Sequence, residues 1–365
     1  FPISHAPAFA PPFPSPSCLG TMWRRPCGRV LRSAGGAGAG AGAREALKNL
    51  QSLAGRYSLS LDTETVNEAS RAASTLRVVG VPEHFNAPFH MAKERGLYEK
   101  RGVDFVWHTE PKGTGAMAQL LEAGEADLAV MLAEGATARA AVGAPLKVVG
   151  TYVSSPLRWG VHVKAGSGLK DKADLKGKVF GVSRMLSGSH LMAHVMAHQK
   201  GWDLAKDAPL KVCGSLDDAR RLMAAGEIDA WLWEKFTTKF LVYSGEWDIV
   251  GEVPTPWPCF LFVASARGLK ERSEEIRQVI EATRPVCEEF KANAGGATVS
   301  YVSKNHAMSE ADAAEWLGGT HWACSNEVQE STLHKTQEAL VTIGQLAEAV
   351  PLTNLIDPSV CRLVS

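Results

Sequence analysis

The sequence has few cysteines, no excess of charge of either sign and no long apolar run, and each absence excludes a class of protein. Its 7 cysteines are scattered and none forms a Cys-x-x-Cys pair, so neither a zinc ribbon nor a disulfide framework is predicted. Lysine plus arginine and aspartate plus glutamate both number 39, which gives no electrostatic reason to expect nucleic-acid binding. No apolar run reaches the roughly 18 residues that a membrane span needs, so we expect no span.

Sequence patterns of common catalytic and metal sites are missing as well. There is no Gly-x-Ser-x-Gly elbow, no Walker loop and no His-Glu-x-x-His. His190, His194 and His198 share a helix face at a four-residue spacing that can bind zinc, but no nearby carboxylate or cysteine completes the set. We therefore assign no catalytic residue, no metal ligand and no cofactor.

The first 74 residues are predicted to be a leader and linker. Residues 1–21 precede the first methionine, Met22, and are rich in proline. From Met22 the chain carries 5 arginines and a Gly/Ala tract, with no acidic residue before Glu45. This composition is typical of an organellar transit peptide, for a mitochondrion or chloroplast. The alternative is a Gly/Ala-rich tail without targeting meaning on a cytoplasmic protein.

One stretch occurs twice in the rest of the chain. The copies run over 113–132 and 215–234 and share the motif Ala-Gly-Glu-x-Asp, which ends at Asp127 and Asp229. Each copy predicts an amphipathic helix, a glycine that tolerates positive φ, a turn and a buried strand. The repeat indicates two similarly built lobes, although such turns also occur in α/β proteins without a repeat. Asp127 and Asp229 are interpreted as turn residues.

Strand and helix patterns alternate over 76–264, which predicts an α/β fold with a largely parallel sheet. Three prolines at 254, 256 and 258 hold the backbone extended and predict a stiff crossing between lobes. Residues 271–349 are predicted to be mostly helical.

Several segments resemble motifs of a known family. They are Ala87–Val103, Gly113–Met117, Ala123–Val130, Trp233–Phe236 and Thr255–Phe260. The first three resemble type II periplasmic-binding-protein domains of the NMT1/ThiY and alkanesulfonate-binding kind. The last two resemble the Ca3427-like subgroup, typified by a Candida protein. The resemblance covers about 76–357 and implies a two-lobed α/β fold with a ligand cleft between lobes. It leaves any transporter partner unknown.

The resemblance and the patterns together suggest how the chain is divided. We expect a leader over 1–74, the first part of lobe 1 over 75–157, lobe 2 over 158–256, the return of lobe 1 with C-terminal helices over 257–357, and a tail over 358–365. Hinges are expected at about 153–159 and 253–260.

Two segments of small residues each open a predicted helix, one in each lobe. They are Gly113, Thr114 and Gly115, and Ser187, Gly188 and Ser189. Helix N-termini expose unpaired N–H groups, which suit a carboxylate, phosphate or sulfonate. The alternative is that the hydroxyls only cap the helices.

Glu134 and Glu234 each follow a predicted buried strand. Because ligands of open α/β sheets bind beyond the carboxyl ends of strands, these carboxylates can accept hydrogen bonds from an amine, an amidine or a ring N–H. The alternative is a solvated loop glutamate at each position.

Further candidate ligand residues are aromatic or follow another strand end. They are His84, Phe85, Asn86, Trp159, His190, Trp233 and Trp257. Indole rings can stack on a flat ligand, whereas for any single tryptophan core packing is the alternative.

These features predict a protein that binds a small polar metabolite, either heteroaromatic and pyrimidine-like or a sulfonate or carboxylate, by hinged lobe closure. Two alternatives remain. One is an enzyme on the same fold, similar to the pyrimidine synthases of thiamine biosynthesis, although their cysteine-rich iron motif is missing here. The other is a ligand sensor that acts through a protein partner.

Overall fold

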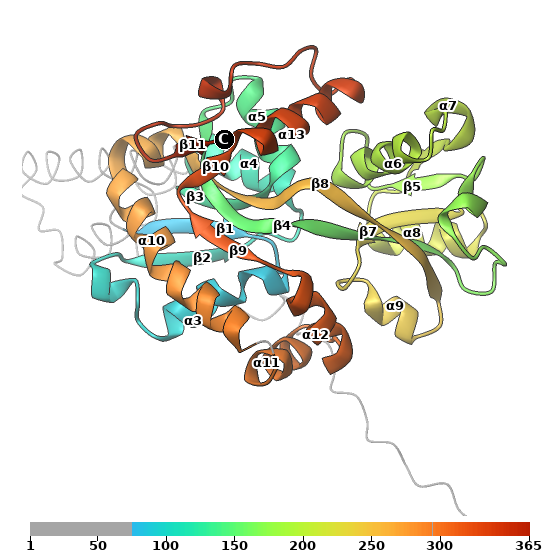
Figure 1. Ribbon diagram of the computed structural model, residues 1–365, viewed down its shortest axis with the longest axis horizontal. Coiled ribbons are helices and arrows are strands. Elements are labelled where there is room, and N and C mark those ends of the chain that lie inside the picture. The colour runs from blue at the N-terminus through green and yellow to red at the C-terminus, as the bar shows by residue number, and fades with distance from the viewer. Residues whose placement is uncertain (1–74, 294) are drawn as a thin grey trace, which may run out of the picture. The chain divides into compact units, whose positions relative to one another are not determined.

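The computed structural model describes residues 75–293 and 295–365 (Figure 1). The predicted transit peptide and linker, 1–74, lie outside the described residues. Within the described part, no helix is long and apolar enough to cross a membrane.

A nine-stranded mixed sheet connects the two lobes of the described chain, in the order β2-β1-β3-β8-β4-β7-β5-β6, with β9 paired to β4. The strands are β1 (Leu76–Gly80), β2 (Phe105–Thr109), β3 (Leu128–Leu132), β4 (Leu146–Lys164), β5 (Phe180–Val182), β6 (Leu210–Val212), β7 (Ala230–Glu234), β8 (Trp247–Ser265) and β9 (Trp322–Ser325). We use lobe 1 for the part around β1–β3 and lobe 2 for the part around β5–β7.

The two crossings between lobes are single strands of 19 residues each, β4 and β8, which run antiparallel to each other (Figure 1). The crossing predicted at 253–260 lies within β8, which continues on both sides of it as one strand. The three prolines lie within β8, where register shifts between Val153/Pro156 and Pro156/Arg158 interrupt the regular ladder with β4. Because proline lacks an N–H, it fits a strand where the ladder is already irregular.

The expectation of a parallel sheet holds only within each lobe. The pairs β1–β2, β1–β3, β5–β6 and β5–β7 are parallel. The pairs β3–β8, β4–β8 and β4–β7 are antiparallel, because each long strand leaves one lobe and enters the other.

Helices cover both faces of the sheet (Figure 1). They are α3 (Ala87–Glu94), α4 (Thr114–Glu122), α5 (Ala133–Ala141), α6 (Gly188–Gln199), α7 (Leu204–Asp207), α8 (Leu216–Ala224), α9 (Lys239–Tyr243), α10 (Ala266–Ala292), α11 (Ala297–Asn305), α12 (Glu310–Gly319) and α13 (Glu330–Thr342). Successive residues of a strand point to opposite faces, so Val78 joins the core with α3 and α10, whereas Val79 joins the core with α4, α5 and α13.

The C-terminal part is mostly helical, as predicted, but it also contributes strands. β9 extends the main sheet by pairing Trp322 with Val153. A second, two-stranded sheet joins β10 (Glu327–Gln329) to β11 (Arg362–Val364), which lies in the predicted tail. These strands have 3 or 4 residues and are too short to show a periodic pattern.

Both copies of the repeated stretch form a helix, a glycine turn and a strand, as predicted. Gly124 and Gly226 have φ of +68° and +71°. The two aspartates end these turns, as interpreted, and each also fastens its strand to the first strand of its lobe. Asp127 Oδ2 accepts the Arg77 N–H at 2.9 Å, and Asp229 Oδ2 accepts the Val179 N–H at 2.9 Å.

Candidate functional site

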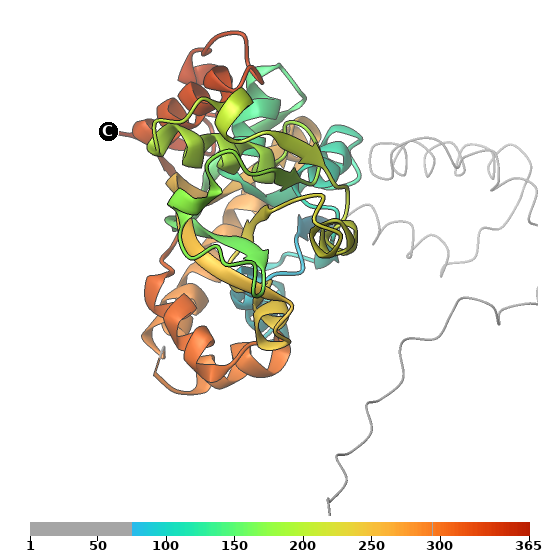
Figure 2. The same cartoon turned by 90° about the vertical axis from the view of Figure 1, so that its right-hand side faces the viewer.

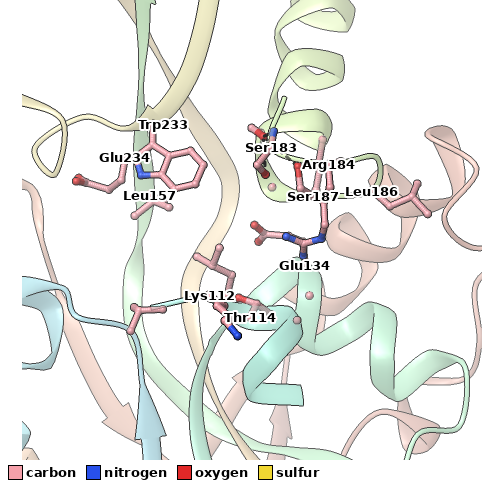
Figure 3. A pocket seen from close by; sticks show the side chains of 18 of the residues that line it. Lys112, Thr114, Glu134, Leu157, Ser183, Arg184, Leu186, Ser187, Trp233 and Glu234 are labelled. Carbon is pink, nitrogen blue, oxygen red and sulfur yellow. Dashed lines mark hydrogen bonds between the residues drawn. The ribbon is translucent and has the colours of Figure 1, made fainter. Parts of the chain in front are cut away.

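A cavity of about 300 Å³ lies between the two lobes (Figure 3). Its walls come from the loop after β1, the N-terminal ends of α4, α5 and α6, the middle of β4 and the end of β7. A cavity of this volume is suited to a small molecule.

Most of the predicted ligand residues line this cavity. These are Gly113, Thr114, Gly115, Glu134, Trp159, Ser187, Gly188, Ser189, Trp233 and Glu234. Lobe 1 contributes the first four and lobe 2 contributes the small-residue segment before α6. The structure therefore brings together at one place residues that lie as far apart in the sequence as 113 and 234.

The loop residues His84, Phe85 and Asn86 do not line the cavity. They form a buried 3-10 turn, in which the Asn86 amide donates to the Val81 carbonyl at 2.8 Å. Phe85 packs on Phe260 with ring centroids 5.1 Å apart. The turn points into the core of lobe 1 because it packs beneath α12, which the sequence did not place there.

Trp257 and His190 also lie outside the cavity, but each supports a residue that lines it. The Trp257 indole N–H donates to Glu134 Oε2 at 3.1 Å. His190 Nδ1 accepts the Leu186 N–H at 2.9 Å and so holds the loop before α6. Leu186 has a φ of +61°, which is strained for a residue with a side chain.

Glu134 is buried in the first turn of α5. Burial raises its pKa to about 7, against the lowering effect of its backbone hydrogen bond and of Trp257. Its Oε1 is shielded from solvent and has no hydrogen-bond partner among residues 75–293 and 295–365. A buried carboxylate oxygen without a donor is unfavourable, so a ligand donor at this point would stabilise it.

Glu83 is a cavity residue that we did not predict. The residue as a whole is partly exposed, but its Oε2 is shielded and has no hydrogen-bond partner in the part of the chain that the structure describes. Burial, together with the charge of Glu234, raises the pKa of Glu83 to about 8. Glu83 follows β1 as Glu134 follows β3, so the strand-end rule that selected Glu134 could have found it.

Glu234 differs from these two because neither of its carboxyl oxygens is both shielded from solvent and without a partner among the described residues. Its Oε2 accepts the backbone N–H and the hydroxyl of Thr237, each at 2.6 Å. Burial still raises its pKa. The cavity thus holds three carboxyl groups whose pKa values are raised above the ordinary value, and two of them have a shielded oxygen without a partner among the described residues.

Two cations that we did not predict also line the cavity, Lys112 and Arg184 (Figure 3). Among the residues that the structure describes, neither side-chain cation has a hydrogen-bond or ion-pair partner. The Arg184 guanidinium lies next to α4, since a Cβ on Gly115 would be 3.2 Å from its Nη2. Isolated cations in loops give no periodic signal, which explains why the sequence did not single them out.

Trp159 and Trp233 form an aromatic wall, with ring centroids 6.3 Å apart at 74°. The wall needs a glycine opposite it, because a Cβ on Gly188 would lie 2.8 Å from Trp159 Cη2. On the lobe 1 side, a Cβ on Gly135 would lie 2.2 Å from Thr114 Cγ2. Both glycines therefore permit close packing around the cavity.

Among residues 75–293 and 295–365, no group of three or more histidine, cysteine, aspartate or glutamate side chains could hold a metal ion. His190 and His194, which share the predicted helix face, instead contact each other, with their Nε2 atoms 3.1 Å apart.

The fold and the cavity between lobes define the class, which is the two-lobed periplasmic-binding-protein fold. The conserved Candida albicans CA3427 gene product, described as having this generic fold, superposes with a TM-score of 0.71 at 27% identity, over 80% of this chain and 98% of that one. The alkanesulfonate-binding protein SsuA from Xanthomonas axonopodis pv. citri, solved with bound MOPS, gives a TM-score of 0.64 at 18% identity, over 80% and 99% of the two chains.

Residues 83–294 match the model of the NMT1/THI5-like family, and the chain belongs to that family. A Haemophilus influenzae protein assigned to thiamine biosynthesis is 37% identical over 102 residues, which are 28% of this chain and 31% of that protein. The match thus spans about a third of the length of that relative.

Proposed function

We propose that the cavity binds one small, flat metabolite with N–H donors at one end and an anionic or acceptor-rich group at the other, of the aminopyrimidine class. The observation that carries the proposal is the pair of unsatisfied carboxyl oxygens, Glu83 Oε2 and Glu134 Oε1. Amino and amidine-like N–H groups supply the donors that these oxygens lack.

The opposite polarity is provided by Arg184 and Lys112, whose cations have no protein partner in the described part of the chain, together with the open N-terminus of α4. Such a combination suits an anion or a strong acceptor on the same ligand. The indole rings of Trp159 and Trp233 provide faces against which a planar ring can stack.

Two of the similar proteins support this ligand class. One relative is assigned to thiamine biosynthesis, and one solved neighbour binds alkanesulfonates. Plain alkanesulfonates are the second candidate, favoured by the two cations, but they leave the glutamate oxygens without donors.

Hinged closure would occur within β4 and β8, where the ladder is irregular on both sides of Pro156. Irregular pairing lets a sheet bend without breaking regular hydrogen bonds. Ligand contacts from both lobes would then favour the closed arrangement.

The test is a titration of the purified full chain, shown to be empty by native mass spectrometry, against 4-aminopyrimidines, aminosulfonates, alkanesulfonates and dicarboxylates. We expect 4-aminopyrimidines to bind most tightly. Glu134→Gln should weaken their binding at least about tenfold, and Arg184→Met should weaken only ligands that carry an anion. Glu246→Gln, which breaks a surface pair with Arg220, is the matched control.

Tighter binding of alkanesulfonates that is unaffected by Glu134→Gln would contradict the aminopyrimidine proposal in favour of the second candidate. The same samples, assayed by mass spectrometry for altered ligand, show whether binding leads to chemistry.

A further inference from the structure

Helix α12 lies outside the segment 83–294 that matches the family model. We call the cavity residues Glu83 and Glu234 the acid pair, and α12 contacts the residue that follows each of them in the chain. It belongs to the C-terminal helices and lies beside α9 of lobe 2 (Figure 1 and Figure 2). Two consecutive α12 residues, Glu315 and Trp316, make the contacts.

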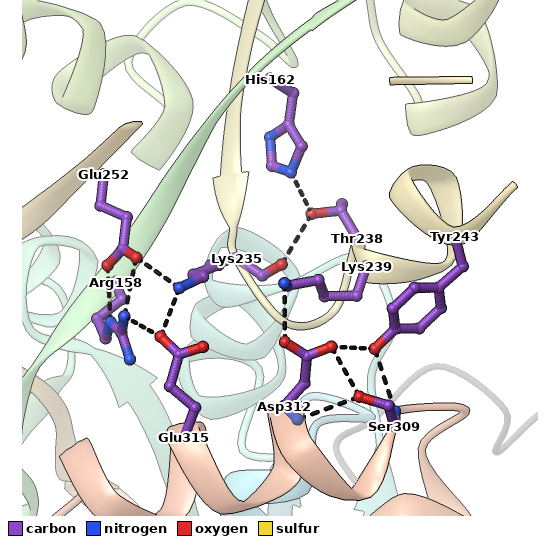
Figure 4. A network of polar contacts seen from close by, with 10 residues as sticks. All are labelled: Arg158, His162, Lys235, Thr238, Lys239, Tyr243, Glu252, Ser309, Asp312 and Glu315. Carbon is purple, nitrogen blue, oxygen red and sulfur yellow. Dashed lines mark hydrogen bonds and ion pairs between the residues drawn. The ribbon is translucent and has the colours of Figure 1, made fainter. Parts of the chain in front are cut away.

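Glu315 reaches lobe 2 (Figure 4). Its Oε1 accepts the Lys235 ammonium at 2.6 Å and the Arg158 guanidinium at 2.6 Å. Lys235 follows Glu234 directly, and its side chain is only 9% exposed. Burial opposes ionisation of Glu315, but the hydrogen bonds and charges of Lys235 and Arg158 hold its pKa below the ordinary value.

Trp316 reaches lobe 1. Its ring packs edge-on against His84, with centroids 4.2 Å apart at 83°, and against Phe85 at 5.2 Å. His84 follows Glu83 directly, and both His84 and Trp316 are buried. The helix therefore holds one residue next to each member of the acid pair.

The ladder between β4 and β7 links these contacts to the cavity. Trp159 pairs with Glu234 in this ladder, and both line the cavity. Their chain neighbours Arg158 and Lys235 both bind Glu252, through Arg158 Nε at 2.7 Å and Lys235 Nζ at 2.5 Å. Within β4, Leu157 and Trp159 line the cavity, so Arg158 between them points to the opposite face of the strand, where it joins this ionic cluster.

A second tie strengthens the same contact. Asp312 of α12 binds the Lys239 ammonium at 2.7 Å and accepts the Tyr243 hydroxyl, both from α9 (Figure 4). Two turns of one helix thus fasten lobe 2 to the helices packed on lobe 1.

We propose that α12 sets the spacing between Glu83 and Glu234 and thereby tunes the affinity of the cavity, with Glu315 and Trp316 as positioning residues that touch no ligand. This inference rests on the proposed function, in which Glu83 and Glu234 face the ligand.

The test uses the full chain and two variants, Glu315→Gln and Trp316→Leu. The first removes a charge and the second does not, and Glu246→Gln is the control. Carbon NMR of protein labelled at glutamate follows the titration of Glu83. The Glu83 signal is assigned by comparison with Glu83→Gln. Burial and, to a smaller extent, the charge of Glu234 raise the pKa of Glu83 to about 8, so looser spacing should lower the midpoint in both variants. Amide exchange should also become faster at 83–87 and 233–238.

With a 4-aminopyrimidine probe, both variants should bind about fivefold more weakly or worse, and the control within about twofold. An unchanged Glu83 midpoint and unchanged exchange in both variants would overturn the inference. If no probe binds the wild type, the proposed function fails, and the NMR and exchange results, which need no ligand, still decide whether α12 spaces the acid pair.

Discussion

The two helix–glycine–strand units, α4–β3 and α8–β7, use the same fastening but differ in what their helices do. In each unit the aspartate after the turn exchanges two hydrogen bonds with the first strand region of its lobe. Asp127 accepts from the Arg77 N–H and donates its own N–H to the Arg77 carbonyl, and Asp229 does the same with Val179. The repeated residues therefore build the scaffold.

The units differ at their helix N-termini. Ser215 caps α8 and forms a capping box with Asp218, so that end is closed. The α4 end has no side-chain cap and opens on the cavity. In lobe 2 the corresponding place at the cavity is taken by α6. The comparison teaches that the sequence repeat marks equivalent parts of the two lobes, and that the groups lining the cavity lie where the copies differ or just beyond their strands.

The largest expected effect separates the two aspartates. Asp127 has no exposed side-chain surface and binds Arg77 and Arg267, whereas Asp229 only accepts a backbone N–H. Asp127→Ala should lower the free energy of unfolding by about 3 kcal/mol, and Asp229→Ala by about 1 kcal/mol, measured by urea unfolding at pH 7. Equal losses of unfolding free energy in the two variants would show that the ion pairs of Asp127 with Arg77 and Arg267 add nothing to stability.

The Asp127 contribution should depend on pH. Burial would raise its pKa, but Arg77 and Arg267 hold it below the ordinary value. A carboxyl group with a depressed folded-state pKa stabilises the fold above its unfolded pKa of about 3.9 and loses this contribution as the pH falls through the folded value. The difference in unfolding free energy between wild type and Asp127→Ala should therefore become smaller below about pH 4.

The next effect separates the two strand-end glutamates. Burial raises the folded-state pKa of Glu134 to about 7. Ionisation of this group therefore destabilises the fold as the pH rises from the unfolded pKa toward 7, and the destabilisation is absent below the unfolded pKa. Glu134→Gln should stabilise the empty protein by about 2–3 kcal/mol at pH 8 and by almost nothing at pH 4. Glu234→Gln should not stabilise, because it disturbs the two hydrogen bonds with Thr237.

Urea unfolding of both glutamate variants at the two pH values checks this. Stabilisation by Glu234→Gln equal to that by Glu134→Gln would show that the Thr237 contacts contribute little. Glu134→Gln is also expected to weaken ligand binding. This variant should therefore gain stability and lose affinity for the ligand.

A smaller effect separates the two helix ends. Ser215→Ala should cost about 1 kcal/mol of unfolding free energy and leave ligand affinity unchanged, because its cap is remote from the cavity. Urea unfolding and calorimetric titration on the same sample measure the two quantities. A loss of affinity without a loss of stability would reverse the roles we assign to the two ends.

The smallest effect is expected at Thr114. Thr114→Val removes the hydroxyl at the cavity but keeps the methyl group against Gly135. Affinity for an anion-bearing probe should fall about two- to tenfold with little change in stability. An unchanged affinity would place the ligand away from the α4 end.

The sequence predicted the parts of the molecule that have a regular period or a strand-end position. The helix–glycine–strand units, the two-lobed class and the placement of Glu134 and Glu234 at the cavity follow from such patterns. His84, Phe85 and Asn86 also follow a strand, but tertiary packing under α12 turns them into the core.

What could not be predicted depends on contacts between distant segments. Prolines and glycines interrupt the pattern of β4 and β8, so each looked like two elements rather than one strand of 19 residues. Arg184 and Lys112 become noticeable only in the fold, where they lie beside the cavity without a partner among the residues that the structure describes. The ties between α12 and lobe 2 join residues about 80 positions apart, such as Lys235 and Glu315.

The position of β8 in the sheet also has a consequence for synthesis of the chain. β8 lies between β3 and β4, and its residues 260–264 pair with 128–132. During translation, one side of the apolar strand β3 stays without its partner until more than 120 further residues have been made. Lobe 2, encoded within that interval, can collapse first. An unpaired apolar strand edge invites contact with other chains, so the edge of β3 is open to such contacts throughout this interval.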